Sequence, residues 1–189
     1  MEKQMTHEES LKIITEMIQQ AKSSYSRGGS FYFLLWGWVY LGASIGFYVS
    51  MKWSLMEHPE LIWLLTVPAV IWTIVRSVRS AKNSSSTSHL QSLHHQLWIA
   101  IGVGIGISLF FMPQLGFYHN AVILTLSGIG TYMTSRIMKY NPLMIGAFIL
   151  WVAAVVSFIV PMTEQYLVAG IGIFAGYLIP GYLLKKEEK

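Results

Sequence analysis

The strongest constraint on this chain is a series of apolar segments, each about as long as a membrane-spanning helix. A hydrocarbon core of about 30 Å needs about 20 apolar residues in a helix. Lipid offers no partner for backbone polar groups, so such segments must be helical. We therefore expect an all-α fold, a polytopic six-transmembrane-helix bundle. Its helices are predicted at about 31–50, 61–78, 96–112, 119–136, 142–160 and 165–184.

The composition agrees with this fold. Only 12% of the 189 residues are charged, against about 25% in a typical soluble domain. The sequence predicts three parts: a cytoplasmic amphipathic helix with a Gly-rich hinge over 1–30, the bundle over 31–184, and a basic and acidic cytoplasmic tail over 185–189.

The amphipathic helix is expected over residues 6–26. Thr6 and Glu9 match a capping box, which satisfies free N–H groups at a helix start. Apolar residues then recur at helical spacing, at Leu11, Ile14, Ile18 and Ala21. We expect this helix to lie on the inner leaflet or beneath the bundle, and to contact a cytoplasmic or membrane protein partner.

The lysines and arginines predict the orientation. With a cytoplasmic N-terminus, Lys52 alone lies outside. The other twelve lie inside: Lys3, Lys12, Lys22, Arg27, Arg76, Arg79, Lys82, Arg136, Lys139, Lys185, Lys186 and Lys189. This asymmetry predicts a multi-pass protein of a bacterial inner membrane with both termini cytoplasmic. Topology and anionic lipid explain the basic pI of 9.3, and no nucleic-acid partner is expected.

The residue types for catalysis and for cofactor binding are missing from the apolar segments. The chain contains no cysteine and no aspartate. Ionisable residues inside a membrane mark ion and proton pathways, whereas Arg76 and Arg136 lie near the cytoplasmic ends, where they can snorkel. We expect no enzyme, no ion-coupled pump, no catalytic residue, no cofactor and no metal.

The six histidines are expected at the interfaces rather than as ligands, because none lies in the middle of a predicted span. His58 and His119 both lie at the predicted outer face, near Glu57 and Glu60. A weak outer metal site or a pH-sensing site is the alternative interpretation there.

Three GxxxG patterns predict close helix packing. Such spacing lets two helix backbones approach each other in lipid. The glycines are Gly42 with Gly46, Gly102 with Gly106, and Gly172 with Gly176. Packing inside the bundle and a homodimer face are the two interpretations.

The segment "LLWGW" in the first span combines two faces of one helix. Trp36 and Trp38 point about 200° apart, so they cannot clamp one ligand. Residues at i and i+4 spacing instead give an aromatic stripe and a groove. The stripe is Tyr32, Trp36 and Tyr40, and the groove is Trp38, Gly42 and Gly46.

Prolines predict hinges in two spans. Pro68 lies inside the second predicted span, and Pro180 with Gly181 lies near the end of the sixth. Proline removes a backbone hydrogen bond and clashes with the carbonyl four residues earlier. A static kink and a moving hinge are both consistent with this pattern.

The junction of the amphipathic helix with the first span also carries a resemblance. The segments "HEESLKIITEMIQQAK" and "FYFLLWGWVYLGASIG" resemble the start of a family of small, uncharacterised bacterial six-span inner-membrane proteins. The resemblance covers residues 7–46 and implies the span count. It implies no activity and no site residue.

Two function classes follow. The first is a non-enzymatic membrane protein that acts as a helix-packing interaction or regulatory module, alone or as a homodimer. The second is a small transporter or channel for a neutral or lipophilic solute. A cavity would favour the second if it were lined by the polar residues Ser44, Ser108, Thr125, Ser127 and Ser157.

Overall fold

The computed structural model describes residues 29–83 and 89–188, and all regular elements in these ranges are helical. The all-α prediction is confirmed. The elements are α2 (Gly29–Trp53), the 3-10 helix η1 (Pro59–Leu65), α3 (Thr66–Asn83), α4 (His89–Phe110), α5 (His119–Met138), α6 (Asn141–Ile159), α7 (Met162–Ile173), the π-helix η2 (Phe174–Leu178) and α8 (Ile179–Glu187). The predicted helix over 6–26 lies outside the described residues.

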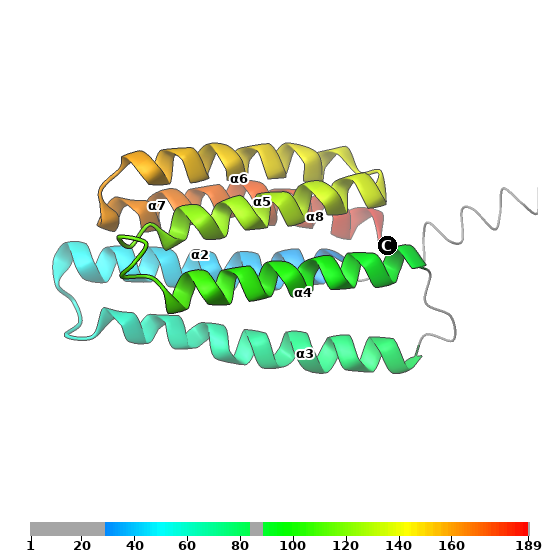
Figure 1. Cartoon of the computed structure of the whole chain (residues 1–189), viewed down its shortest axis with the longest axis horizontal. Coiled ribbons are helices and arrows are strands. Elements are labelled where there is room, and N and C mark those ends of the chain that lie inside the picture. Colours follow the sequence, from blue (N-terminus) through cyan, green and yellow to red (C-terminus); the bar gives the residue numbers. More distant parts are fainter. Residues whose placement is uncertain (1–28, 84–88, 189) are drawn as a thin grey trace, which may run out of the picture.

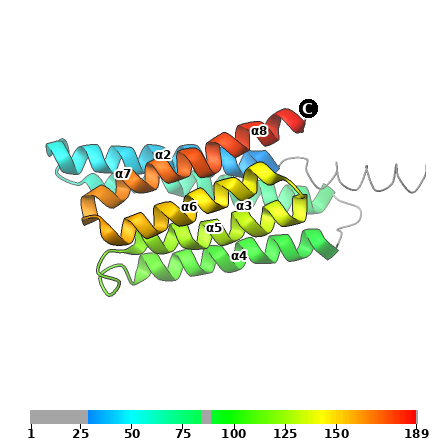
Figure 2. The same cartoon turned by 90° about the horizontal axis from the view of Figure 1, so that it is seen from above.

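The helices run along one common axis, so the bundle has two ends (Figures 1 and 2). At one end α2 begins and α5 and α8 finish. We name this the inner end, because the positive-inside rule predicts it to be cytoplasmic. At the opposite, outer end α2 finishes and α5 and α7 begin. α7, η2 and α8 follow one another as a single helical run.

By length and hydropathy, the chain is a multi-pass membrane protein. Five stretches qualify as candidate spans: Gly29–Trp53, Pro59–Arg79, Gln91–Phe110, Asn141–Ile159 and Met162–Glu187. The remaining predicted span, at about 119–136, corresponds to α5, which is not among the five because its polar residues lower its hydropathy. α5 lies between α4 and α6 and packs along both (Figure 2), so many of its polar side chains are covered by protein.

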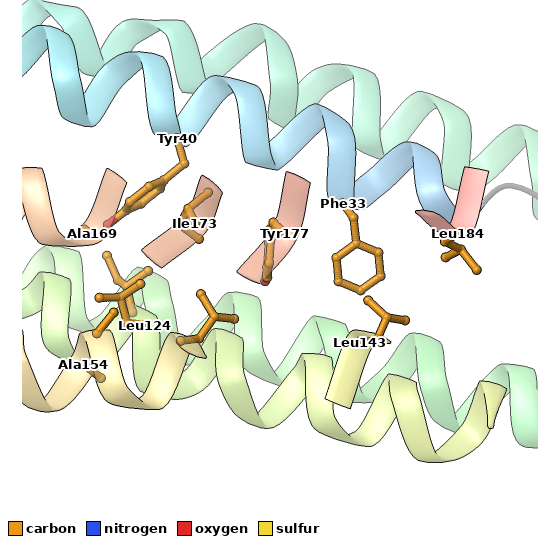
Figure 3. Packing of buried hydrophobic residues seen from close by; sticks show 12 residues of the cluster. Phe33, Tyr40, Leu124, Leu143, Ala154, Ala169, Ile173, Tyr177 and Leu184 are labelled. Atoms are coloured by element: carbon orange, nitrogen blue, oxygen red, sulfur yellow. The ribbon is translucent and has the colours of Figure 1, made fainter. Parts of the chain in front are cut away.

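The core is built by α2, α5, α6 and the run from α7 to α8. Each contributes buried side chains, for example Tyr40 of α2, Leu124 of α5, Leu143 of α6 and Ile173 of α7 (Figure 3). In lipid, van der Waals packing rather than the hydrophobic effect holds such helices together.

The helices α3 and α4 lie at the periphery. Only 6% of the most apolar stretch within Pro59–Arg79, which contains η1 and most of α3, is buried. For Gln91–Phe110, which contains most of α4, the value is 11%. The exposed side chains over residues 67–75 and 99–110 are apolar, as expected for faces directed to lipid or to another membrane helix, whereas the exposed polar residues Arg76, Arg79, Ser92, His95 and Gln96 lie toward the inner end.

The start of α2 shows a contact that the sequence did not predict. The first span was expected from residue 31, after a Gly-rich hinge, whereas α2 begins at Gly29. The Glu188 carboxylate accepts hydrogen bonds from the Ser30 N–H and hydroxyl. An anion at a helix N-terminus satisfies free donors and interacts favourably with the helix dipole. The C-terminal segment thereby contacts Ser30 of the predicted hinge, which the structure places in α2.

The two prolines lie at changes of helix type. Pro68 is the third residue of α3, directly after η1, so it occupies a first helical turn, where its missing N–H is tolerated. Pro180 is the second residue of α8 and follows η2. Pro180 has no N–H to donate to the Gly176 carbonyl. The loss of this hydrogen bond explains why the helix widens to a π-helical turn at this point.

Candidate functional site: a buried polar cluster

Polar side chains gather inside the apolar core near the outer end. We name Tyr40, His119, Asn120, Gln165 and Tyr166 the polar cluster. Each is at most 9% exposed. The first residues of α5 and the first turn of α7 supply four of them, and α2 supplies the fifth. Because α5 and α7 both begin at the outer end, the topology brings these residues to one level.

Two hydrogen bonds connect the three helices. The Tyr40 hydroxyl donates to Asn120 Oδ1 at 2.8 Å and joins α2 to α5. The Tyr166 hydroxyl lies 3.3 Å from His119 Nε2 and joins α7 to α5. In an environment that excludes water, each bond satisfies groups that would otherwise be costly to bury.

Other polar atoms at this end are buried without a hydrogen-bond partner among the described residues. Three belong to the polar cluster: Asn120 Nδ2, His119 Nδ1 and Gln165 Oε1. The others are the hydroxyl oxygens of Ser44, one turn after Tyr40 on α2, and Ser157, in the last turn of α6. A buried polar atom without a partner costs about 1–3 kcal/mol, so such atoms indicate a place where a further polar molecule can bind.

Aromatic rings border the polar cluster. The Trp63 ring lies 5.3 Å from Tyr40 and 6.1 Å from Tyr166, centroid to centroid. The Phe47 ring lies 4.3 Å from Tyr166. Trp63 is carried by η1, whose C-terminal end is fixed by a 2.6 Å hydrogen bond from the Thr66 hydroxyl to the Trp63 carbonyl.

Charged side chains occupy the rim rather than the polar cluster itself. Lys52 Nζ lies 2.9 Å from Glu164 Oε1, and the two side chains are 49% and 32% exposed. Ion pairs at such exposure contribute about 0–1 kcal/mol. The polar cluster itself contains no Lys, Arg, Asp or Glu side chain.

The histidines at the outer end do not converge. His119 lies at the outer end as expected, but it is buried against Tyr166, whereas His58 is exposed and lies 2.9 Å from Glu60. Across residues 29–83 and 89–188, no group of three or more His, Cys, Asp or Glu side chains could hold a metal ion.

The residues of the predicted aromatic stripe have three different surroundings. Tyr32 lies 5.5 Å from the Phe31 ring. The Trp36 indole N–H donates to Thr73 Oγ1 of α3 at 3.2 Å. Tyr40 belongs to the polar cluster. The stripe therefore connects α2 to α3 at one residue and to α5 at another.

The predicted groove on α2 is partly open. The Trp38 N–H donates to the Tyr182 hydroxyl at 3.0 Å on the exposed surface, beside α8. A Cβ added to Gly46 would lie 3.4 Å from Ile62 of η1, whereas one added to Gly42 would meet no described atom within 4 Å.

The other two GxxxG pairs differ from each other. A Cβ on Gly172 would lie 2.6 Å from Ala153, and one on Gly176 would lie 2.9 Å from the Gly146 carbonyl, so these glycines permit close packing of α7 and η2 against α6. Added to Gly102 or Gly106 of α4, a Cβ would meet no described atom within 4 Å.

The five hydroxyl residues proposed to line a solute cavity fall into separate groups. Ser108 and Thr125 each donate to the carbonyl four residues earlier in their own helix, at 2.8 Å. Ser127 is buried at 5% exposure in α5. Ser44 and Ser157 have the partnerless hydroxyls described above.

Several polar contacts were not predicted from the sequence. Asn120 and Gln165 were not selected as site residues, although an amide side chain close to an apolar segment is a detectable signal. Toward the inner end, Trp98 donates to His94 Nε2 at 3.0 Å, and this nitrogen lies 2.9 Å from Thr134 Oγ1. This second polar group joins α4 to α5.

Comparison of the chain with protein-family models, with curated proteins and with solved structures gave no match. The resemblance of residues 7–46 to a family of six-span bacterial proteins stays a prediction.

Proposed function

We propose that this chain is a non-enzymatic transporter or channel for a small, uncharged polar solute, and that the polar cluster is its binding site. One observation carries the proposal: partnerless polar atoms from four helices are buried at the outer end of the bundle. If the protein bound no solute, apolar side chains at these positions would make the bundle more stable than the partnerless polar ones do.

The polar cluster defines the chemical class of the solute. Asn120 Nδ2 is a donor, Gln165 Oε1 is an acceptor, and His119 Nδ1 can be either. A solute with both donors and acceptors fits this set, as an amide or a polyol does. A charged solute is disfavoured because no counter-charge lies in the polar cluster. The neighbouring ring of Trp63 suits an apolar face of the solute.

Access would come from movement of η1. Trp63 contacts both tyrosines of the polar cluster, and η1 directly precedes the proline-containing first turn of α3. Displacement of this segment would uncover the polar cluster toward the outer face. The peripheral position of α3 makes such a movement less costly than a rearrangement of the core.

The test uses the absence of natural cysteines. Ser44→Cys and Ser157→Cys place a thiol at the two partnerless hydroxyls, and Ser108→Cys is the matched control, buried but hydrogen-bonded. In proteoliposomes, a membrane-impermeant thiol reagent should label the first two variants faster than the control. Glycerol or urea, if bound, should slow this labelling.

A permeability measurement completes this test. Stopped-flow light scattering should show faster entry of glycerol or urea into proteoliposomes of the native protein than into those of Asn120→Leu. If neither thiol is labelled and neither solute enters faster than in protein-free vesicles, the solute-binding function is wrong.

A second candidate function is that of an interaction module, and the exposed face of α4 favours it. Gly102 and Gly106 have no described neighbour, and Ile99, Val103 and Phe110 beside them are 54%, 58% and 80% exposed. This face carries no charge, and two copies of it can pack closely in lipid. The oligomeric state of the full-length protein in detergent tests this candidate.

A further inference from the structure

The inner end of the bundle contains a cavity that the solute-binding proposal does not use. It lies at the turn between α5 and α6 and has a volume of about 250 Å³. Ser135, Arg136, Lys139, Asn141 and Met144 line it. This end is opposite the polar cluster.

The cavity is electrically positive. Arg136 and Lys139 both line it, and neither has an ion-pair partner among residues 29–83 and 89–188. Ser135 is 3% exposed, and its hydroxyl donates to the Tyr132 carbonyl at 2.7 Å. The first turn of α6 lies in the same wall, and a helix start carries a partial positive charge.

Neither Glu187 nor Glu188 forms an ion pair with Arg136 or Lys139. Glu188 is held by the Ser30 N–H and hydroxyl at the start of α2. Glu187 lies near Tyr140, and burial, together with this carboxylate, raises the pKa of the Tyr140 hydroxyl. Tyr140 therefore stays neutral at physiological pH.

The backbone at Lys139 is unusual for a lysine. Its φ of 53° is left-handed, and its N–H donates to the Ser135 carbonyl to terminate α5. Glycine or asparagine adopts this conformation more readily, and other residues lose about 1 kcal/mol there. A lysine at this position supplies a cation to the cavity at a cost in stability.

An apolar aromatic surface continues from the cavity toward the middle of the membrane. Tyr132 lies one turn before Arg136 on α5, and Phe148 lies one turn after Met144 on α6. Their rings are 6.3 Å apart, and the Trp151 ring lies 5.5 Å from Phe148. The Phe148 side chain is 52% exposed. A free phosphate would not use this surface, whereas an acyl chain would.

We propose that this cavity binds the phosphodiester headgroup of an anionic glycerophospholipid of the inner leaflet. Arg136 and Lys139 neutralise the phosphate, the Asn141 amide contacts the headgroup oxygens, and one acyl chain lies along Tyr132 and Phe148. Basic pockets between helices on the cytoplasmic side suit such headgroups.

The experiment uses full-length protein, delipidated in a non-ionic detergent. Dioleoylphosphatidylglycerol, dioleoylphosphatidylcholine and inorganic phosphate are added separately, and bound lipid and melting temperature are measured by native mass spectrometry and thermal unfolding. The variant Arg136→Gln/Lys139→Asn removes both cations and places at 139 a residue that tolerates the left-handed backbone. Arg79→Gln, an inner-end cation outside the cavity, is the matched control.

We expect phosphatidylglycerol to raise the melting temperature of the native protein and of Arg79→Gln, and to bind the double variant on the order of tenfold more weakly. Unchanged binding to the double variant would overturn the proposal. An equal loss in Arg79→Gln would show a general charge effect. An equal shift with inorganic phosphate would show a free-phosphate site instead, and a shift with phosphatidylcholine as large as that with phosphatidylglycerol would exclude recognition of the anionic charge.

Discussion

Tyr40 and Asn120 show how strongly one hydrogen bond can act inside this bundle. Asn120 is fully buried, its Oδ1 accepts from Tyr40, and its Nδ2 has no partner among the described residues. Removal of the tyrosine hydroxyl would leave the amide oxygen of Asn120 without its donor. The cost of that change belongs to the amide that remains, not to the hydroxyl that is lost.

We therefore expect Tyr40→Phe to lower the free energy of unfolding in mixed micelles by about 1–3 kcal/mol. Tyr182→Phe, which removes an exposed hydroxyl that accepts from the Trp38 N–H, should change it by less than about 0.5 kcal/mol. The double variant Tyr40→Phe/Asn120→Leu should recover most of the loss, because it removes the buried amide as well. Equal effects of Tyr40→Phe and Tyr182→Phe would contradict this account.

The sequence predicted one member of this pair and not the other. Tyr40 was found because it continues an i, i+4 stripe within one helix. Asn120 lies 80 residues away in sequence, and only the packing of α2 against α5 brings the two side chains together. Local spacing contains no information about such a contact. An amide near an apolar segment indicates that a partner is needed, but it does not identify the partner.

Between elements, α6 lies directly against the backbone of η2. A Cβ on Gly146 would lie 2.5 Å from the Gly176 carbonyl oxygen and 3.1 Å from Pro180. The Gly176 carbonyl also lacks the usual donor, because Pro180 has no N–H. The glycine thus allows α6 to lie against an irregular part of the neighbouring helix.

Gly146→Ala should consequently force the two helices apart and lower the free energy of unfolding by about 1–3 kcal/mol. Gly102→Ala on the open face of α4 is the control. Its Cβ meets no described atom, so its effect should be near zero or slightly stabilising. Thermal unfolding in detergent distinguishes the two, and a Gly146→Ala protein as stable as Gly102→Ala would show that the helices separate without cost.

The helix positions could be predicted because hydropathy over a membrane-length window decides them. The irregular turns could not. η1 and η2 depend on where proline falls relative to neighbouring helices, and the contact of Ser30 with Glu188 joins residues that lie 158 positions apart in the sequence. These features arise from tertiary contacts, which no single segment encodes.

At the scale of the whole molecule, the two candidate sites lie at opposite ends of the bundle. The outer end contains neutral, partnerless polar groups, and the inner end contains cations beside a cavity. The sequence predicted the charge of the inner end from its lysines and arginines. It did not predict the polar cluster, because the members of the cluster come from different helices. The buried polar side chains of α5 lower its hydropathy, and some of them hydrogen-bond to other helices.

The interaction module makes a prediction for the intact protein. The core and the contact between Ser30 and Glu188 lie within 29–188, so deletion of residues 1–26 should leave the melting temperature of the bundle unchanged. Gly106→Leu should also leave it unchanged, because that position faces no described atom.

Light scattering in detergent then assigns the interface. Loss of a dimer on deletion alone would place the contact in residues 1–26, and loss in Gly106→Leu alone would place it on α4. If the native protein and both variants are monomers and a pull-down captures the same proteins with or without residues 1–26, the chain is not an interaction module, and the solute-binding function stands alone.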